Sequence, residues 1–288
     1  MEKRNFNVTT DSASDAGRDY LEKLDASFIS FNFTDGETSY KDEMDKEQNH
    51  WFYEQMRAGT VFKTSQLNVD QYEEFFLNEG KKGLPIIHIS LCEGLSNTVN
   101  NARIAAVNVK KQGVKVHVID ATIACLGIYL MTVEACKYRD EGMKFNEAID
   151  ALERKAKTLR TYYTTEDLTY FARGGRLSKS AAFFSKLLKI NVILDCDEIG
   201  RLNVKFKFKG RKKAFEQIVQ LVNNEVVNPE TQTLAVVHAE NLEGAKLLAE
   251  EVLKVIPFKN VEYHEMGPTI GAHAGPGLIA VFYFGTVK

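Results

Sequence analysis

Short apolar runs alternate with longer segments of helix-like spacing over the first part of the chain. The strand candidates are residues 6–10, 27–33, 84–90 and 114–120. The helix candidates that follow the second strand are residues 69–78, 97–112, 122–139 and 145–160, and a further helix carries Trp51 after a polar loop at 34–46. Strands that alternate with helices of this length are typical of parallel βαβ units. We therefore predict an α/β fold with a parallel sheet in its N-terminal domain, residues 1–160.

The pattern changes after residue 160. Two runs at 190–195 and 202–209 predict paired strands that turn at Glu198-Ile199-Gly200, and Ser178 predicts the start of a helix to Leu188. The remaining strand candidates are residues 161–163, 234–238, 261–265 and 278–284, and the remaining helix candidates are 166–171, 212–226 and 242–255. We predict an α+β C-terminal domain, residues 161–288.

Polar residues follow several of the predicted strands. Loops after the carboxyl ends of parallel strands carry ligands, which places Asp11-Ser12, 92–96 and 120–122 at one edge of the sheet. Thr64-Ser65 joins them if residues 61–62 are extended. The segment 92–98 also opens a helix, whose N-terminus suits a carboxylate or a phosphate, although Ser96 could equally serve only as the helix cap.

The densest turn signal lies at residues 267–277, with four glycines and two prolines in eleven residues. Such a composition is typical of backbone with unusual dihedral angles and close approach. His273 lies within it between two alanines, and the apolar run after it predicts a buried strand. The pattern indicates a tight connection that either places His273 against a small polar ligand or holds it incidentally.

Two other stretches combine basic residues with a possible site. Arg173-Gly174-Gly175-Arg176 could place a guanidinium group against an anion or could be a solvated helix end. The second stretch is a strand whose basic residues alternate with Phe206 and Phe208, which indicates one charged and one apolar face. Its basic residues and those just after it are Lys205, Lys207, Lys209, Arg211, Lys212 and Lys213. They form either a solvated face or a docking patch for an acidic or phosphate-bearing partner.

Composition narrows the function classes. A formal net charge of −2 gives no support for nucleic-acid binding. The chain has no run of 18 apolar residues and no apolar signal segment at its start, so we expect a cytoplasmic protein without a membrane-spanning segment. The four cysteines form no CxxC pair and the histidines show no HExxH spacing, so we expect reduced thiols and no metal site.

Several short motifs, each weak alone, occur in one order along the chain. They are Thr10-Asp11-Ser12, Thr64-Ser65-Gln66, Leu95-Ser96, Gly174-Gly175-Arg176-Leu177-Ser178 and Gly271-Ala272-His273-Ala274-Gly275-Pro276-Gly277. The ordered set resembles the DegV family. The resemblance implies two α/β domains with a long-chain fatty acid buried between them. It also implies the acyl-binding subunit of a bacterial fatty acid kinase, in which a separate kinase phosphorylates the bound acid.

The resemblance also assigns residues. It implies that Thr64, Ser96 and His273 bind the carboxyl group of the fatty acid and that Arg176 lies near them. A family arginine associated with kinase docking falls at Lys209, so the partner kinase is expected to dock through Lys205, Lys207, Lys209 and Arg211. We expect a monomer with no cofactor besides the lipid. The chain departs from the family pattern at Cys92, Glu93, Asn97 and Leu67, and a Glu93 carboxylate would repel a fatty-acid anion unless it points away.

Elementary energetics is compatible with such a ligand. A sixteen-carbon chain carries roughly 14 methylene groups, and burying each contributes about 0.8 kcal/mol, on the order of 11 kcal/mol before the costs of association. The buried carboxylate needs hydrogen-bond donors, which two hydroxyl groups and an imidazole can supply. The same residues allow a hydrolase of lipid esters in which His273 is the base and Ser96 or Cys92 the nucleophile, although residues 92–98 lack a GxSxG turn. A lipid carrier or sensor without a kinase partner is the third alternative.

Overall fold

A parallel four-stranded sheet forms the centre of the N-terminal half in the computed structural model, which describes residues 4–177 and 190–287. Its strands, in spatial order, are β2 (Ser27–Ile29), β1 (Asn7–Asp11), β6 (Ile86–Ser90) and β7 (Val116–Asp120). All neighbouring strands are parallel. Every residue of β6 is buried because helices cover both faces, which is the reason for its continuous apolar pattern. The predicted α/β class is confirmed.

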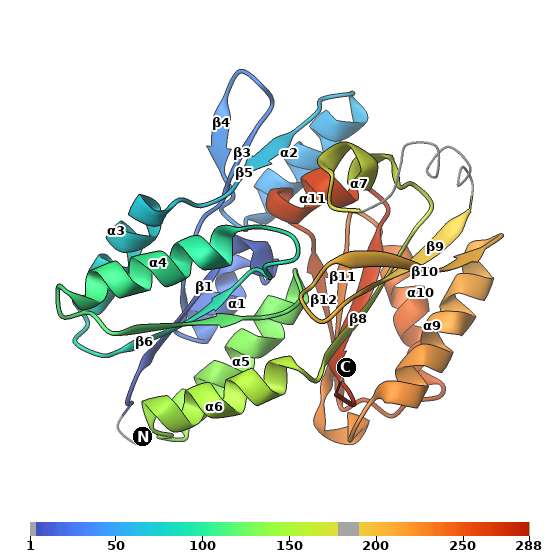
Figure 1. Cartoon of the computed structure of the whole chain (residues 1–288). Coiled ribbons are helices and arrows are strands. Elements are labelled where there is room, and N and C mark those ends of the chain that lie inside the picture. The colour runs from blue at the N-terminus through green and yellow to red at the C-terminus, as the bar shows by residue number, and fades with distance from the viewer. Residues whose placement is uncertain (1–3, 178–189, 288) are drawn as a thin grey trace.

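Helices form a layer on each side of this sheet (Figure 1). On one side, α3 (Val69–Gly80) and α4 (Thr98–Lys110) pack on each other and against β6. On the other side, α5 (Leu126–Asp140) packs on β1 and on α6 (Phe145–Ala156). Residues 126–132 of α5 are all buried because this helix also contacts the strands of a second sheet. The two sheets therefore share α5 as a common apolar layer.

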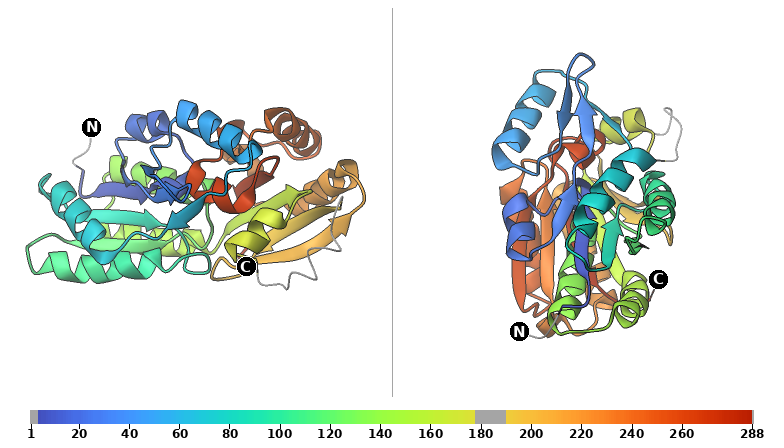
Figure 2. Two further views of the ribbon diagram at one scale, coloured as in Figure 1. Left: turned by 90° about the horizontal axis from the view of Figure 1, so that it is seen from above. Right: turned by 90° about the vertical axis from the view of Figure 1, so that its left-hand side faces the viewer.

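The second sheet is mixed and has the strand order β10-β9-β8-β13-β11-β12. Its strands are β8 (Leu159–Thr165), β9 (Asn191–Cys196), β10 (Leu202–Phe208), β11 (Thr233–His238), β12 (Asn260–Glu265) and β13 (Ile279–Phe284). Only β11 and β12 are parallel among the described pairs. The helices α9 (Arg211–Glu225) and α10 (Leu242–Leu253) pack on this sheet around their own apolar cluster. Figure 2 shows this half beside the N-terminal half along an elongated molecule.

This mixed sheet agrees with the predicted α+β character of the second half. The hairpin of β9 and β10 turns where it was predicted, since Gly200 has a φ of +89° between the two strands. The division at residue 160 stays a prediction, and it falls beside the start of β8 at Leu159. The predicted helix from Ser178 to Leu188 lies outside the described residues.

A small antiparallel sheet of order β4-β3-β5 was missed by the sequence analysis. Its strands are β3 (Asn32–Thr34), β4 (Ser39–Lys41) and β5 (Lys63–Ser65), and α2 (Lys46–Arg57) follows β4. The predictions of one strand at 27–33 and a loop at 34–46 were therefore wrong. The strand breaks because the Phe31 amide donates to Ser12 Oγ at 3.0 Å instead of joining a ladder. The rings of Tyr40, Trp51, Phe52 and Phe62 surround Phe33 and hold the small sheet in place.

The glycine-rich stretch at 267–277 is a short helix rather than a tight connection. The helix α11 (Pro268–Ala274) begins with a proline at its first position, where the missing N–H is not needed, and Gly275 ends it with a φ of +76°. A Cβ atom on Gly271 would lie 2.6 Å from the Tyr53 hydroxyl oxygen. Close packing against an aromatic side chain, and not chain reversal, explains that glycine. The other short elements are η1 (Ser12–Ser14), α1 (Arg18–Lys23), α7 (Thr169–Gly174) and η2 (Pro229–Thr231).

Candidate functional site

One cavity, of about 60 Å³, is lined by all four side chains that were expected to bind a carboxyl group. Thr64 comes from β5, Ser96 from the loop before α4, and His273 from α11. Arg176 follows α7. The apolar part of the lining consists of Phe31, Leu91, Leu95, Phe171, Leu202 and Ile270. Polar groups from both halves thus meet beside an apolar surface.

Thr64 lies on an element that the sequence analysis did not predict. It lies in the middle of β5, in the small antiparallel sheet, and not in a loop at the edge of the parallel sheet. In that position it pairs with Phe33 of β3. The hydroxyl oxygen Oγ1 of Thr64 lies 2.7 Å from His273 Nε2. The contact joins residues that are 209 positions apart in the sequence.

His273 is a neutral imidazole in this environment. Burial, reinforced by the positive charge of Arg176, lowers the pKa of His273 from 6.5 to about 4. Its Nδ1 atom is buried and has no hydrogen-bond partner among the described residues. An unpaired buried N–H is less favourable than an unpaired ring nitrogen, so the proton belongs on Nε2. His273 therefore presents an N–H donor toward Thr64 and the cavity.

Gly174 explains how the imidazole is held in this orientation. A Cβ atom at this position would lie only 2.2 Å from His273 Nδ1, so no other residue fits there without moving the ring. Gly275 likewise has no room for a side chain, because a Cβ there would lie 2.1 Å from a ring carbon of Tyr170. Neither role was found from the sequence, although the Gly174-Gly175 pair and the glycines of α11 were visible signals.

Ser96 directly precedes Asn97, the N-cap residue of α4, and its side chain lies both beside this helix and at the cavity. Its Oγ accepts a hydrogen bond from the Thr98 amide at 3.3 Å and lies 2.8 Å from Thr98 Oγ1, so it supports the start of α4. It also lines the cavity. A hydroxyl group that accepts from its own helix keeps its proton available for a second oxygen, which suits it to donate to a ligand.

Arg176 supplies positive charge beside these hydroxyl groups. Among the described residues, its guanidinium group contacts backbone carbonyl oxygens, that of Gly174 at 2.6 Å and that of Leu95 at 3.4 Å. Burial lowers the pKa of Arg176 from its ordinary value of 12.5, but an arginine stays charged at neutral pH. A guanidinium group held by backbone carbonyl oxygens is a suitable partner for a carboxylate.

Two of the three residues of the 92–98 segment that depart from the family pattern, Cys92 and Glu93, do not line the cavity. Glu93 is exposed and lies 3.8 Å from the guanidinium group of Arg103, so its charge points away from the headgroup residues. Cys92 is completely buried beneath the second sheet, and a Cβ on Gly200 would lie 2.3 Å from its Sγ. The repulsion that Glu93 could have caused is therefore avoided.

The predicted basic surface is exposed on the second sheet. Lys205, Lys207 and Lys209 point outward from β10 and the turn after it, and Arg211 begins α9. β10 is the edge strand of this sheet among the described strands, and Leu177 forms an isolated bridge with Leu202 at its start. Lys205 is engaged with Asp195 at 2.7 Å.

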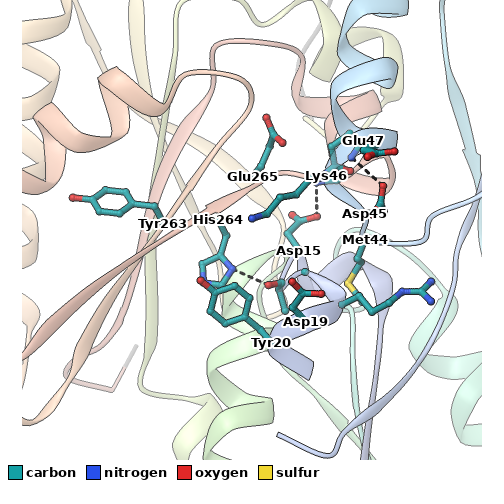
Figure 3. Close-up of a pocket in the computed structure, with 15 residues that line it drawn as sticks. Asp15, Asp19, Tyr20, Met44, Asp45, Lys46, Glu47, Tyr263, His264 and Glu265 are labelled. Atoms are coloured by element: carbon teal, nitrogen blue, oxygen red, sulfur yellow. Dashed lines mark hydrogen bonds between the residues drawn. The ribbon is translucent and has the colours of Figure 1, made fainter. Parts of the chain in front are cut away.

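A second, larger cavity of about 290 Å³ lies where α1, α2 and β12 meet (Figure 3). Asp15, Tyr20, Lys46, His264 and Glu265 are among its lining residues. Its wall is ordered by a hydrogen bond between His264 Nδ1 and the Ala16 carbonyl oxygen at 2.8 Å. None of the four expected headgroup residues lines this cavity. Its acidic lining makes it a poor place for a carboxylate.

No group of three or more histidine, cysteine, aspartate or glutamate side chains in residues 4–177 and 190–287 could hold a metal ion. No helix in the same ranges is both long enough and apolar enough to cross a membrane.

Comparison with known proteins identifies the family. A family model described as "Uncharacterised protein, DegV family" matches residues 5–286. The chain belongs to the DegV family. This confirms the resemblance inferred from the ordered motifs. A DegV domain-containing protein of Clostridium perfringens is 32% identical over 288 residues, which cover 99% of both chains.

Two solved DegV structures are similar in both sequence and fold. DegV from Bacillus subtilis, described as a fatty acid binding protein, is 28% identical with a TM-score of 0.85 and covers 98% of this chain and 100% of its own. A Thermotoga maritima protein whose structure is described as revealing a fatty acid binding function is 27% identical. Its TM-score is also 0.85, with 98% of this chain and 100% of that chain covered. The DegV fold is thus common to these proteins and to this chain.

Proposed function

We propose that this DegV protein binds a long-chain fatty acid, with its carboxyl group held by Thr64, Ser96, His273 and Arg176. The observation that carries the proposal is that these four side chains, from four separate elements, line one cavity. Two hydroxyl groups and one guanidinium group provide the donors that a buried carboxylate requires, and the His273 Nε2–H donates to Thr64 Oγ1, which leaves the proton of that hydroxyl group for the carboxylate. The relatives described as fatty acid binding proteins support the same ligand class.

The acyl chain would follow the apolar side of this cavity. A volume of about 60 Å³ is small beside a sixteen-carbon chain, so the apolar lining must separate for the chain to enter. Phe171 of α7 and Leu202 of β10 come from the second half, whereas Phe31 and Leu91 come from the first. A path between these side chains would run between the two halves of the molecule.

Mass spectrometry of an organic extract of the purified protein tests the ligand directly. We expect a fatty acid in a one-to-one ratio with protein. Ser96→Ala and His273→Ala should each retain about tenfold less lipid, because the first removes a donor to a charged oxygen and the second removes the group that orients the Thr64 donor. A clean extract from a protein that also fails to bind added palmitate would contradict the proposal, and unchanged retention in both variants would contradict the headgroup assignment.

We further propose that the bound carboxyl group is presented to a separate kinase rather than phosphorylated by this protein. The exposed basic residues Lys207 and Lys209 on the edge strand β10 offer a docking surface for it. Charge reversal at both positions should reduce formation of acyl phosphate by a partner kinase, trapped as the hydroxamate, and leave palmitate affinity unchanged. Equal acyl phosphate formation by the charge-reversed protein would rule out this surface, and acyl phosphate formed without any kinase would rule out the division of labour.

The geometry does not favour the hydrolase alternative. The hydrogen bond of His273 Nε2 is made to Thr64, whereas Ser96 Oγ is bonded to Thr98. The Cys92 thiol is completely buried and does not line the cavity. A serine or cysteine nucleophile requires a base within hydrogen-bond reach, and neither candidate is bonded to His273 among the described contacts.

A further inference from the structure

Two aspartates behind the headgroup site have no part in the binding contacts described above. Asp15 is 2% exposed and Asp42 is 0% exposed. Neither is in an ion pair with a basic side chain among the residues that the structure describes. Burial of a carboxyl group away from a cation is unfavourable unless hydrogen bonds compensate. Hydrogen-bond donors must therefore surround these two carboxyl groups.

Both carboxyl groups receive hydrogen bonds from the first turn of α11. Asp15 Oδ1 accepts from the Gly267 amide at 2.9 Å, and Asp42 Oδ2 accepts from the Thr269 amide at 3.1 Å. The Thr269 hydroxyl group also donates to Asp42 Oδ2. The N-cap residue Gly267 has no side chain of its own to satisfy these amides. The two carboxyl groups thus cap α11 and complement the positive end of its dipole.

The same contacts connect the element that carries Thr64 to the helix that carries His273. Asp42 directly follows β4, and its amide donates to the Phe31 carbonyl oxygen at 2.8 Å. β4 pairs with β3, and β3 pairs with β5, where Thr64 lies. On the helix side, His273 is one turn after Thr269. Asp42 therefore links the two partners of the Thr64–His273 hydrogen bond.

We propose that Asp15 and Asp42 are positioning residues of the headgroup site, which hold α11 so that His273 stays in contact with Thr64. They touch neither the cavity nor the expected ligand, and they act through Gly267 and Thr269. This inference rests on the proposed function, because the property that Asp15 and Asp42 support is the affinity for a carboxyl headgroup.

The pKa shifts of the two carboxyl groups show that each depends on its hydrogen bonds to α11. Burial raises the pKa of Asp42, and the hydrogen bonds from Thr269 partly lower it again. Burial also raises the pKa of Asp15 well above its ordinary value, and the Gly267 amide opposes that change. Displacing α11 would leave both carboxyl groups buried without these donors. The helix and the carboxyl groups therefore stabilise each other.

The experiment compares palmitate with methyl palmitate, which has the same chain but no carboxylate. Asp42→Asn turns an N–H group toward one of the donors that Asp42 now satisfies, those of Thr269 or that of Met44. We expect it to lower palmitate affinity about tenfold while methyl palmitate affinity changes less than about twofold. Thr269→Val removes the hydroxyl donor to Asp42 and should shift the affinities in the same direction by a smaller factor if Asp42→Asn does not fold. Because Thr269 also lines the headgroup cavity, the titration of His273 is the deciding readout for this variant.

Glu225→Gln is the matched control, because Glu225 is a partly buried carboxylate that accepts from Tyr162 and Tyr283 in the second sheet, away from α11. It should weaken neither ligand selectively. NMR of the His273 ring provides a second readout that needs no lipid. Asp42→Asn and Thr269→Val should each raise the pKa of His273 from about 4 toward 6.5, as the ring becomes less buried.

Equal weakening of palmitate and methyl palmitate, or no weakening of either, together with an unchanged His273 pKa, would overturn the positioning role. A wild-type protein that binds no fatty acid would instead contradict the proposed function. In that case the His273 titration alone decides whether Asp42 positions the ring: a raised pKa in Asp42→Asn and Thr269→Val supports it and an unchanged pKa refutes it. The same titration of Asp15→Asn, in which the contact with the Gly267 amide is altered, decides the role of Asp15.

Discussion

Gly174→Ala should weaken fatty-acid binding although it removes no atom that contacts the ligand. The added methyl group would lie 2.2 Å from His273 Nδ1, about 1 Å inside an ordinary van der Waals contact. The ring must shift by about that amount. A shift of this size lengthens the 2.7 Å contact between His273 Nε2 and Thr64 Oγ1 beyond hydrogen-bond range.

The expected loss follows from the hydrogen bonds involved. A displaced imidazole no longer orients the Thr64 hydroxyl group toward the ligand. That hydroxyl group's hydrogen bond to a charged carboxylate contributes about 1.5 to 3 kcal/mol, so its loss should make palmitate bind roughly ten- to a hundredfold more weakly. Isothermal titration calorimetry with delipidated protein measures this change. Gly174 closes the short helix α7, where alanine is a better helix former than glycine, so the free energy of unfolding should not fall by a similar amount.

A double-mutant cycle with His273→Ala separates the mechanism from a general disturbance. If Gly174 acts only through the imidazole, then adding Gly174→Ala to His273→Ala should cause no further loss of affinity. Additive losses would refute the reasoning, as would a Gly174→Ala protein with wild-type affinity and an imidazole still bonded to Thr64.

Three further predictions concern charge and burial. The His273 ring should titrate near pH 4 in NMR, and Arg176→Gln should raise its pKa; a value near 6.5 in the wild type would contradict the buried site. Burial raises the pKa of Asp11 from 3.8 to about 7, so Asp11 stabilises the fold below about pH 4 and loses that contribution as pH rises to about 7. The unfolding free energy of the wild type relative to Asp11→Asn, from urea titrations, should decrease over this interval. The four cysteines are all buried, so a thiol reagent should modify none of them until the protein unfolds.

Local sequence patterns were sufficient to predict most of the helices and strands. The long apolar runs and helical segments predicted β6, β7, α4 and α6 close to their observed bounds, because each buries one continuous or periodic face. The small sheet was missed because its strands contain only three residues each, which is too short for a period to be visible. Its stability comes from the aromatic cluster around Phe33, whose members are spread from Tyr40 to Phe62.

The headgroup site was also predicted only in part from the sequence. The residue types were available from the ordered motifs, and the structure places Thr64, Ser96, His273 and Arg176 around one cavity. The helical state of residues 268–274 was not predicted, because glycine and proline are typical of turns when no neighbour is known. Here the glycines permit close contact with aromatic rings of residues that are distant in the sequence.

The sequence alone determined the alternation of strands and helices, the family, and the donor groups available for a carboxyl ligand. Those features depend on neighbours along the chain, or on motifs whose order is visible in one dimension. Only the tertiary structure decided that Gly174 supports His273, that Glu93 points away, and that Asp42 binds a helix 227 positions later. Each of these depends on a distance in space between groups far apart in the sequence, which local propensity does not encode.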